Sequence, residues 1–234
     1  MVISELTYVT RCKHECNTEN YHMSKVDGVD MKITIIEFQK MLVAASSALN
    51  EKIDEFSRID SLYGDGDHGV TMERISKEIA ATSEMEFDSI SEMFKDLGKR
   101  VMNVHGGSAG PLYGMIFDGF GDGLKGVVEA SRDDIHSMFK GALESFSIVS
   151  NAKEGDKTMM DVLIVACRKA DESKEELPEY LIEIGKAAID GAERTKEFQA
   201  KFGRARFHKE ATIGTMDAGA CSLATLISGL SEGF

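Results

Sequence analysis

Helical periodicity is the feature of this sequence that most constrains its fold. Between residues 34 and 59, apolar side chains recur every three or four positions, which places them on one face of a helix. Thr34 and Glu37 open the segment with the spacing of a capping box, in which each side chain accepts a hydrogen bond from a backbone amide at the helix start. The period ends before Gly64 and Gly66. The pattern predicts one long helix with a buried stripe.

Most of the remaining chain has the same character. Ser89 and Glu92 form a second predicted capping box, and Pro111 and Pro178, the only prolines, suit first helical turns. Short connections favour antiparallel neighbours, and no strand is predicted. The sequence therefore predicts an all-α fold, an antiparallel eight-helix up-and-down barrel or bundle, as a single domain over residues 32–234. The seven further helices are expected at residues 72–82, 89–102, 111–120, 133–149, 158–170, 178–199 and 218–230.

Composition excludes several classes of protein. The 234 residues include 40 acidic and 27 basic side chains, and the net charge of −13 argues against a nucleic-acid partner. The hydrophobic content of 42 % excludes wholesale disorder, and no apolar run approaches the roughly 20 residues of a membrane span. The 4 cysteines are too few for a disulfide scaffold, and residues 1–11 lack the apolar stretch of a signal peptide. We expect a cytoplasmic protein with no membrane or nucleic-acid partner.

Residues 1–31 differ from the rest because they are polar and have no sustained period. We expect them to form an N-terminal extension, poorly ordered or disordered. Cys12 and Cys16 could in principle bind zinc, but no second ligand pair follows them. An incidental tail is the favoured interpretation.

The segment 60–69 carries the strongest chemical signal. Asp60, Asp65 and Asp67 lie between two predicted helices, and flanking glycines allow the backbone to turn sharply. Clustered carboxylates repel one another unless a cation or protons neutralise them, and hard oxygen ligands suit Mg²⁺ or Ca²⁺. The calcium EF-hand spacing fails, because Ser76 would occupy the bidentate position. We therefore expect magnesium here rather than a solvated acidic turn.

Three further loops are candidates for binding a phosphate group. Small residues at 106–110, which follow His105 and include the Ser108 hydroxyl, precede a helix start and would form either an anion site or a packing turn. The segment 154–159 is not a P-loop; Asp156 is predicted to cap the next helix, and Lys157 to touch a phosphate or face solvent. Arg204, in the long loop that follows residue 200, would bind a phosphate or pair with the acidic body of the protein.

Together these motifs resemble the nucleotide-binding L subunit of bacterial dihydroxyacetone kinases and the equivalent domain of single-chain kinases. The resemblance extends from about residue 33 to the C-terminus. Its pieces are Gly-Asp-Gly-Asp-His-Gly at 64–69, Gly-Gly-Ser-Ala-Gly-Pro-Leu-Tyr-Gly at 106–114, Gly-Asp-Lys-Thr-Met at 155–159, Gly-Arg-Ala at 203–205 and Ile-Gly-Thr-Met-Asp-Ala-Gly-Ala at 213–220.

The resemblance implies an eight-helix barrel with ADP or ATP at one open end. It places two Mg²⁺ ions on Asp60, Asp65 and Asp67. Ser150 and Ala218 stand where the family more often has glycine and proline. The contacts to the nucleotide would come from His68, Gly69, Val70, Thr71, Ser108, Ala109, Ser150, Met159, Arg204, Asp217, Ala218 and Gly219.

The activity implied is that of a dihydroxyacetone-type (glycerone) kinase, which transfers a phosphoryl group to a small hydroxy-ketone. In the family a separate K-type subunit holds the sugar through a histidine, so no catalytic residue is expected on this chain alone. A small separate chain favours the type in which ADP stays bound and a phosphocarrier subunit of the phosphotransferase system rephosphorylates it. A homodimer is also compatible. The alternatives are a non-catalytic nucleotide-binding regulator, or a kinase domain serving another acceptor such as a tetrulose or a fatty acid.

Overall fold

The computed structural model describes residues 31–234, which form nine α-helices and two 3₁₀ segments and contain no strand. The predicted extension, including Cys12 and Cys16, lies outside the described residues except for Met31. None of the described helices is long and apolar enough to cross a bilayer. The elements are α1 Ile35–Glu51, α2 Ile53–Asp60, α3 His68–Ser83, α4 Ile90–Met102, α5 Ala109–Gly123, α6 Arg132–Val149, α7 Met159–Glu172, α8 Glu179–Arg194, η1 Thr195–Glu197, η2 Ala205–Thr212 and α9 Ala218–Glu232.

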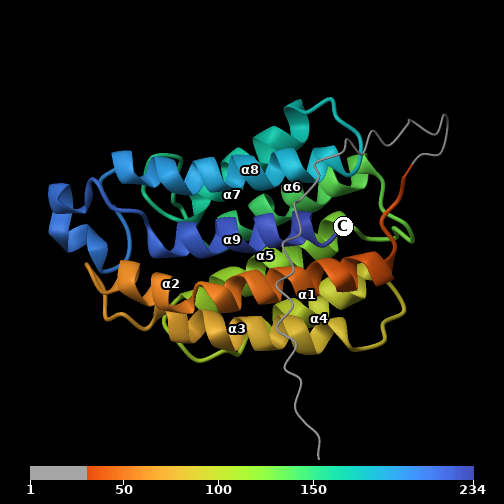
Figure 1. The fold of residues 1–234 in the computed structure, drawn as a ribbon, viewed down its shortest axis with the longest axis horizontal. Helices are drawn as coiled ribbons and strands as arrows, with labels where there is room; N and C mark the ends of the chain where they lie inside the picture. Colours follow the sequence, from red (N-terminus) through yellow and green to blue (C-terminus); the bar gives the residue numbers. More distant parts are fainter. Residues whose placement is uncertain (1–30) are drawn as a thin grey trace, which may run out of the picture.

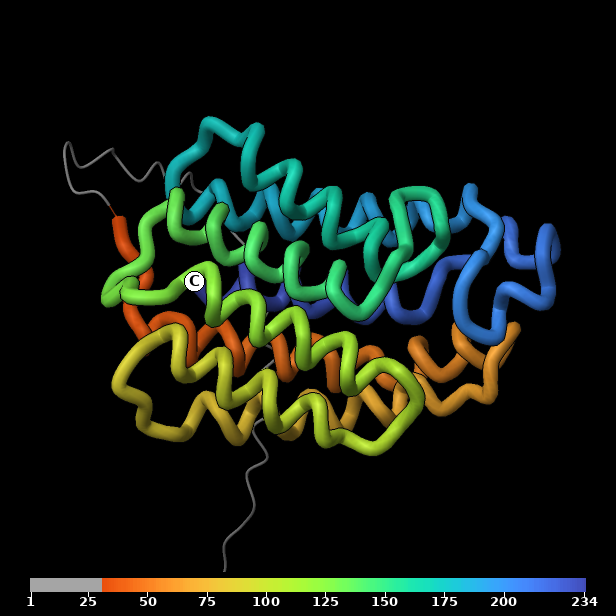
Figure 2. Tube along the Cα trace, turned by 180° about the vertical axis from the view of Figure 1, so that it is seen from behind, coloured from red at the N-terminus to blue at the C-terminus, as the bar shows by residue number. Residues whose placement is uncertain are grey.

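Eight of these helices close an antiparallel ring (Figures 1 and 2). Around the ring, α3 packs on α1, and each helix from α4 to α9 packs on the one before it. The ring closes because α9 also packs on α1. The short α2 packs at one end of the ring, against α3 and α9. The predicted all-α up-and-down barrel is thus confirmed.

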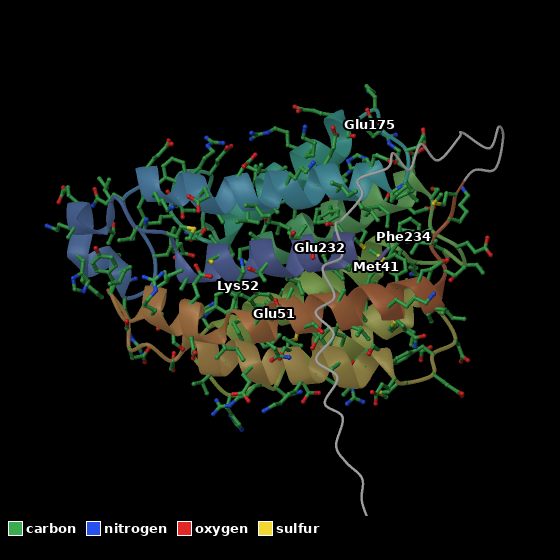
Figure 3. The ribbon with its side chains drawn as sticks, in the orientation of Figure 1. Met41, Glu51, Lys52, Glu175, Glu232 and Phe234 are labelled. Atoms are coloured by element: carbon green, nitrogen blue, oxygen red, sulfur yellow. The ribbon has the colours of Figure 1, made fainter. Side chains whose placement is uncertain are left out.

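The single long helix expected over residues 34–59 is broken in two. Lys52 has φ −113° and ψ 10°, so it ends α1 and precedes α2 (Figure 3). Apolar periodicity alone does not reveal the break, because Phe56 and Ile59 on α2 are buried like the stripe of α1. The described residues therefore hold nine α-helices instead of eight.

The predicted helix starts are right in part. Thr34 and Glu37 form the expected capping box, but Glu92 accepts from the amide of Asp88, so only the Ser89 half of the second box exists. Pro111 is the third residue of α5, because that helix begins at Ala109. Pro178 is the N-cap of α8 instead of a residue in its first turn.

Aromatic rings fill the middle of the barrel. Phe38, Phe94, Phe120 and Phe139 form a chain of edge-to-face pairs with ring centroids 5.4–5.6 Å apart. All four side chains are at most 2 % exposed. Their burial, together with the favourable edge-to-face geometry, ties α1, α4, α5 and α6 together.

Glycines allow the backbone of α5 to contact the backbones of α4 and α6, between which α5 runs in Figure 2. A Cβ atom on Gly119 would collide with the carbonyl oxygen of Gly141 and lie 2.6 Å from Cα of Ala142 on α6. On the other side, a Cβ on Gly114 would lie 2.9 Å from the carbonyl oxygen of Gly98 on α4. Backbone atoms cannot move aside as side chains do, so these crossings fix the spacing of the three helices.

We predict that Gly119→Ala lowers the free energy of unfolding by about 1–3 kcal/mol, because overpacking against backbone outweighs the helix-propensity gain of about 1 kcal/mol. Gly185→Ala is the matched control on α8, since its Cβ would meet mainly the movable Ser231 hydroxyl, at 2.6 Å. Urea denaturation measures both variants. Equal stabilities would show that the crossing of α5 and α6 is not tight.

Candidate functional site

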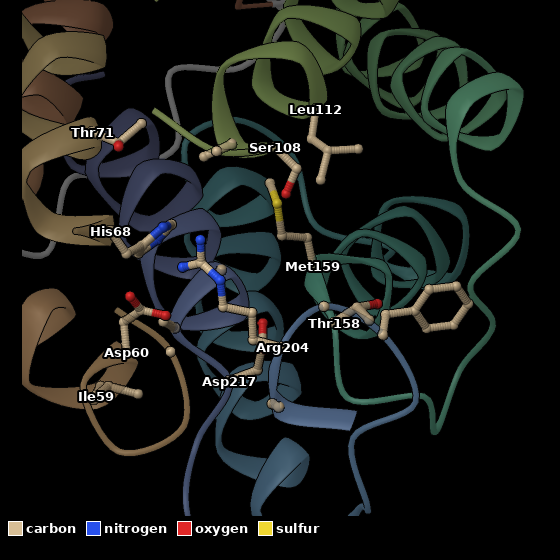
Figure 4. A pocket seen from close by; sticks show the side chains of 18 of the residues that line it. Ile59, Asp60, His68, Thr71, Ser108, Leu112, Thr158, Met159, Arg204 and Asp217 are labelled. Carbon is tan, nitrogen blue, oxygen red and sulfur yellow. The ribbon is translucent and has the colours of Figure 1, made fainter. Parts of the chain in front are cut away.

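One end of the barrel holds a cavity of about 530 Å³, into which the labelled side chains of Figure 4 point. Because the helices alternate in direction, α3, α5, α7 and α9 all begin at this end. Each helix amino terminus carries a partial positive charge and unpaired amide groups. Four such termini around one cavity favour an anionic ligand, although the protein as a whole is acidic.

The three predicted aspartates meet on one wall of this cavity. Asp60 ends α2, Asp65 lies in the following loop, and Asp67 is the N-cap of α3. Carboxylate oxygens of the three lie within 4.8 Å of one another. The loop folds back on itself because Gly66, at φ 75°, donates its amide to Asp60 Oδ2 at 2.8 Å. Within residues 31–234 no other group of three possible metal ligands meets this criterion.

The charges in this trio are only partly balanced. Arg204 forms an ion pair with Asp65, and its hydrogen bond holds the pKa of the Asp65 carboxyl below the ordinary value. Loss of hydration and then the nearby Asp65 charge raise the pKa of Asp67. One guanidinium among three carboxylates leaves negative charge at the cavity wall. An all-oxygen donor set of this kind fits Mg²⁺.

The amino termini of α3 and α5 keep their amide groups free of side-chain caps. Gly106 and Gly107, at φ 140° and 50°, lead into α5 at Ser108, whose side chain is exposed. A Cβ on Gly106 would collide with the Thr71 hydroxyl, so this loop lies directly against α3. The uncapped start of α5 thus leaves amide groups without a side-chain partner in the same cavity as the aspartates, an arrangement that suits an anion.

His68 lies between the aspartates and the barrel interior. Its Nε2 is 2.8 Å from the Ser222 hydroxyl, to which Tyr113 donates, also at 2.8 Å. Burial lowers the pKa of the imidazole, so the neutral form dominates at neutral pH. Ser222 and Tyr113 are not among the predicted site residues. Tyr113 belongs to the motif 106–114, but nothing near either residue in the sequence indicates this contact.

The opposite side of the cavity is apolar. Met159, the first residue of α7, is 4 % exposed, and Leu112 from α5 lies near it on this side (Figure 4). Gly219 packs so closely that a Cβ there would lie 2.9 Å from Cγ of Met159. Further apolar side chains on this side come from Phe146, Val149, Phe202 and Met216. A flat apolar ring would find contact here, while an anionic group would find it at the uncapped start of α5.

The start of α7 differs from its prediction. Thr158 caps the helix in a capping box with Asp161, whereas Asp156 pairs with Lys201 at 2.6 Å, so the predicted cap was wrong. Lys157 does not face solvent, since it is 3 % exposed and its ammonium donates to backbone carbonyls. Asp217 caps α9 through the amide of Ala220, and burial raises the pKa of its carboxyl to about 6.

Nearly all predicted site residues line this cavity. Gly69 and Val70 do not: a Cβ on Gly69 would collide with the carbonyl oxygen of Ile53, so Gly69 allows α3 to approach α2, and the Val70 side chain is exposed. The predicted residues in the lining are Asp60, Asp65, Asp67, His68, Thr71, Ser108, Ala109, Ser150, Met159, Arg204, Asp217, Ala218 and Gly219.

Known proteins share this architecture. The crystal structure of the dihydroxyacetone kinase of C. freundii in its native form matches 97 % of the chain with a TM-score of 0.66 and 26 % identity, over 39 % of that protein. The structure of the same kinase in complex with AMP-PNP and Mg²⁺ has the same fold, with a TM-score of 0.68 at 24 % identity over 94 % of this chain and 38 % of that one.

Sequence comparison gives two kinds of relative. The L-erythrulose kinase of Pectobacterium atrosepticum is 32 % identical over 81 % of this chain, which spans only 33 % of that protein's length. The PTS-dependent dihydroxyacetone kinase ADP-binding subunit DhaL of Lactococcus lactis is 32 % identical over 78 % of this chain and 91 % of its own length. The ADP-binding subunit DhaL of the Escherichia coli PEP-dependent dihydroxyacetone kinase is 26 % identical over 82 % of this chain and 94 % of its own length. Since residues 62–232 also match the DAK2 domain, this chain belongs to the DAK2-domain family.

Proposed function

We propose that this chain is the nucleotide-binding subunit of a dihydroxyacetone-type kinase. It would hold ADP or ATP with two Mg²⁺ ions and serve phosphoryl transfer to a small hydroxy-ketone bound on a K-type partner. The observation that carries the proposal is the division of one cavity into an aspartate wall, an uncapped helix start and an apolar side. Relatives of nearly the same length are named ADP-binding subunits, which supports it.

Different residues would bind different parts of the nucleotide in this proposal. The base would lie against Met159 and Leu112, while the phosphates would meet the amides that open α5. Asp60, Asp65 and Asp67 would hold the magnesium ions. When bound, these ions supply neutralisation of the charge on the transferring phosphoryl group.

Arg204 has a separate part in the same site. Its guanidinium reaches the aspartate wall from the segment that precedes η2, and it pairs with Asp65. A side chain with a planar fork at this position can exchange a carboxylate for a phosphate oxygen. We propose that it turns to the phosphates when nucleotide is present, which leaves Asp65 to the metal.

The type in which ADP is retained as a coenzyme is the version we favour. The two DhaL relatives above carry PTS-dependent or PEP-dependent in their names, and a phosphocarrier subunit would then be the phosphoryl donor. A tetrulose acceptor is the second candidate, because L-erythrulose kinase is 32 % identical to this chain. The acceptor would be selected by the partner that holds it.

The nucleotide that copurifies tests the proposal directly. We expect protein that has been desalted and then denatured to release ADP in an amount close to that of the chain, as measured by mass spectrometry. Protein that loses ADP at once but binds ATP with Mg²⁺ would reject the coenzyme version alone. Protein that binds neither ADP nor ATP in the presence of Mg²⁺ would reject the function.

Asp65→Asn is expected to weaken Mg²⁺-dependent ADP binding at least about tenfold, since it removes one of three carboxylates from the metal wall, and tenfold corresponds to about 1.4 kcal/mol. Titration calorimetry with and without EDTA measures the effect. Asp122→Asn is the control, because Asp122 pairs with Lys95 near the far end of α5. Unchanged magnesium dependence in Asp65→Asn, with the same circular dichroism as the parent, would refute the ligand assignment.

Gly219→Ala is expected to lower ADP affinity about tenfold while leaving Mg²⁺ binding intact. The added Cβ would displace Met159, which lies 2.9 Å from it, into the cavity on the side proposed for the base. Gly185→Ala again serves as control, because Gly185 lies outside the cavity lining. ADP affinity equal to that of the parent would place the base elsewhere.

A further inference from the structure

Lys157 is a buried lysine in the cavity lining that has no part in the proposed metal and phosphate contacts. Its residue is 3 % exposed, and its Nζ donates to the carbonyl oxygen of Thr195 at 2.6 Å and to that of Thr215. Two of the three N–H donors of its ammonium therefore bind backbone carbonyls and not a ligand. Asp217 and Asp161 are the carboxylates whose charge acts on it.

The backbone at this position is strained. Lys157 has φ 61°, in the left-handed region that is unfavourable for a residue with a Cβ. Burial also lowers the pKa of the ammonium, because the charged group loses hydration there. A strained residue with a desolvated charge persists where its surroundings hold it, and such residues concentrate at functional sites.

The carbonyls that Lys157 holds come from two segments, and one of these segments leads directly into the cavity lining at Met216. Thr195 begins η1 after α8, and Thr215 lies just before α9. The amide of Asp217 donates to Thr195 Oγ1 at 3.0 Å, so the same threonine is bonded from both sides. Lys157 thus joins the start of α7 to the turn 215–219, at whose end Gly219 packs on Met159.

We propose that Lys157 is a positioning residue that holds the turn 215–219 against the start of α7 and thereby shapes the base-binding side of the site. This inference rests on the proposed function. The lysine acts through Met159 and Gly219, and it does not bind the phosphates. Its loss should therefore weaken binding of the nucleoside part of the ligand and spare the diphosphate part.

The test compares two ligands on three proteins. Lys157→Met keeps the length of the side chain and the strained backbone but removes the ammonium. We expect its affinity for ADP with Mg²⁺ to fall about tenfold or more, and its affinity for inorganic pyrophosphate with Mg²⁺ to stay within about twofold of the parent, both by calorimetry. Lys153→Met is the matched control, since it removes an exposed lysine from the same loop, and it should change neither affinity.

Each other outcome is decisive. Equal losses for ADP and pyrophosphate would mean that Lys157 acts as a charge on the phosphates, and unchanged ADP affinity would mean that it positions nothing; either overturns the inference. If Lys157→Met does not fold, Thr195→Val decides, because it removes the hydroxyl bonded to Asp217 and should give the same selective loss. A parent protein that binds no ADP would instead refute the proposed function.

Discussion

The alternation of helix direction is the constraint on which the site depends. In a closed up-and-down ring every second helix begins at the same end, and here those helices are α3, α5, α7 and α9. Their amino termini create a positive field at one opening of a protein with a net charge of −13. The aspartates lie at the same opening, so carboxylate oxygens and helix amino termini line one cavity.

Rigid crossings keep this opening in shape. The close approach of α5 to α4 and α6 rests on backbone contact at Gly114 and Gly119, which leaves little freedom for the helices to slide. The loops between these fixed helix ends complete the cavity lining. The long segment between η1 and α9 is the largest of them, and it reaches the aspartate wall through Arg204 and the α7 start through Lys157.

Part of the fold and of the site follows from the sequence because the signals are local. The helical period and the capping box at Thr34 are read within a few residues, and so is the cluster of aspartates among glycines. A helix start with two possible capping residues is harder to predict from sequence. Asp156 and Thr158 are both of capping type, and Asp156 instead forms a long-range ion pair with Lys201. The break at Lys52 likewise leaves no mark on the apolar period.

Long-range contacts explain the features that sequence does not reveal. Tyr113 and Ser222 are 109 positions apart, and no residue adjacent to either in the sequence indicates that they form a hydrogen bond. The burial of Lys157 depends on carbonyls 38 and 58 positions away. A lysine beside Gly and Thr suggests a phosphate contact by composition, and only the packed barrel shows that its ammonium is turned to the backbone.

The bridge between Ile33 and Ala130 determines where the polypeptide enters the barrel. Those residues lie beside the start of α1 and the turn from α5 to α6, which is the end remote from the aspartates. The 17 residues of α1 alone separate the two ends by about 25 Å. An affinity tag or a fluorophore joined directly ahead of Ile33 would thus be attached at the end of the barrel remote from the cavity.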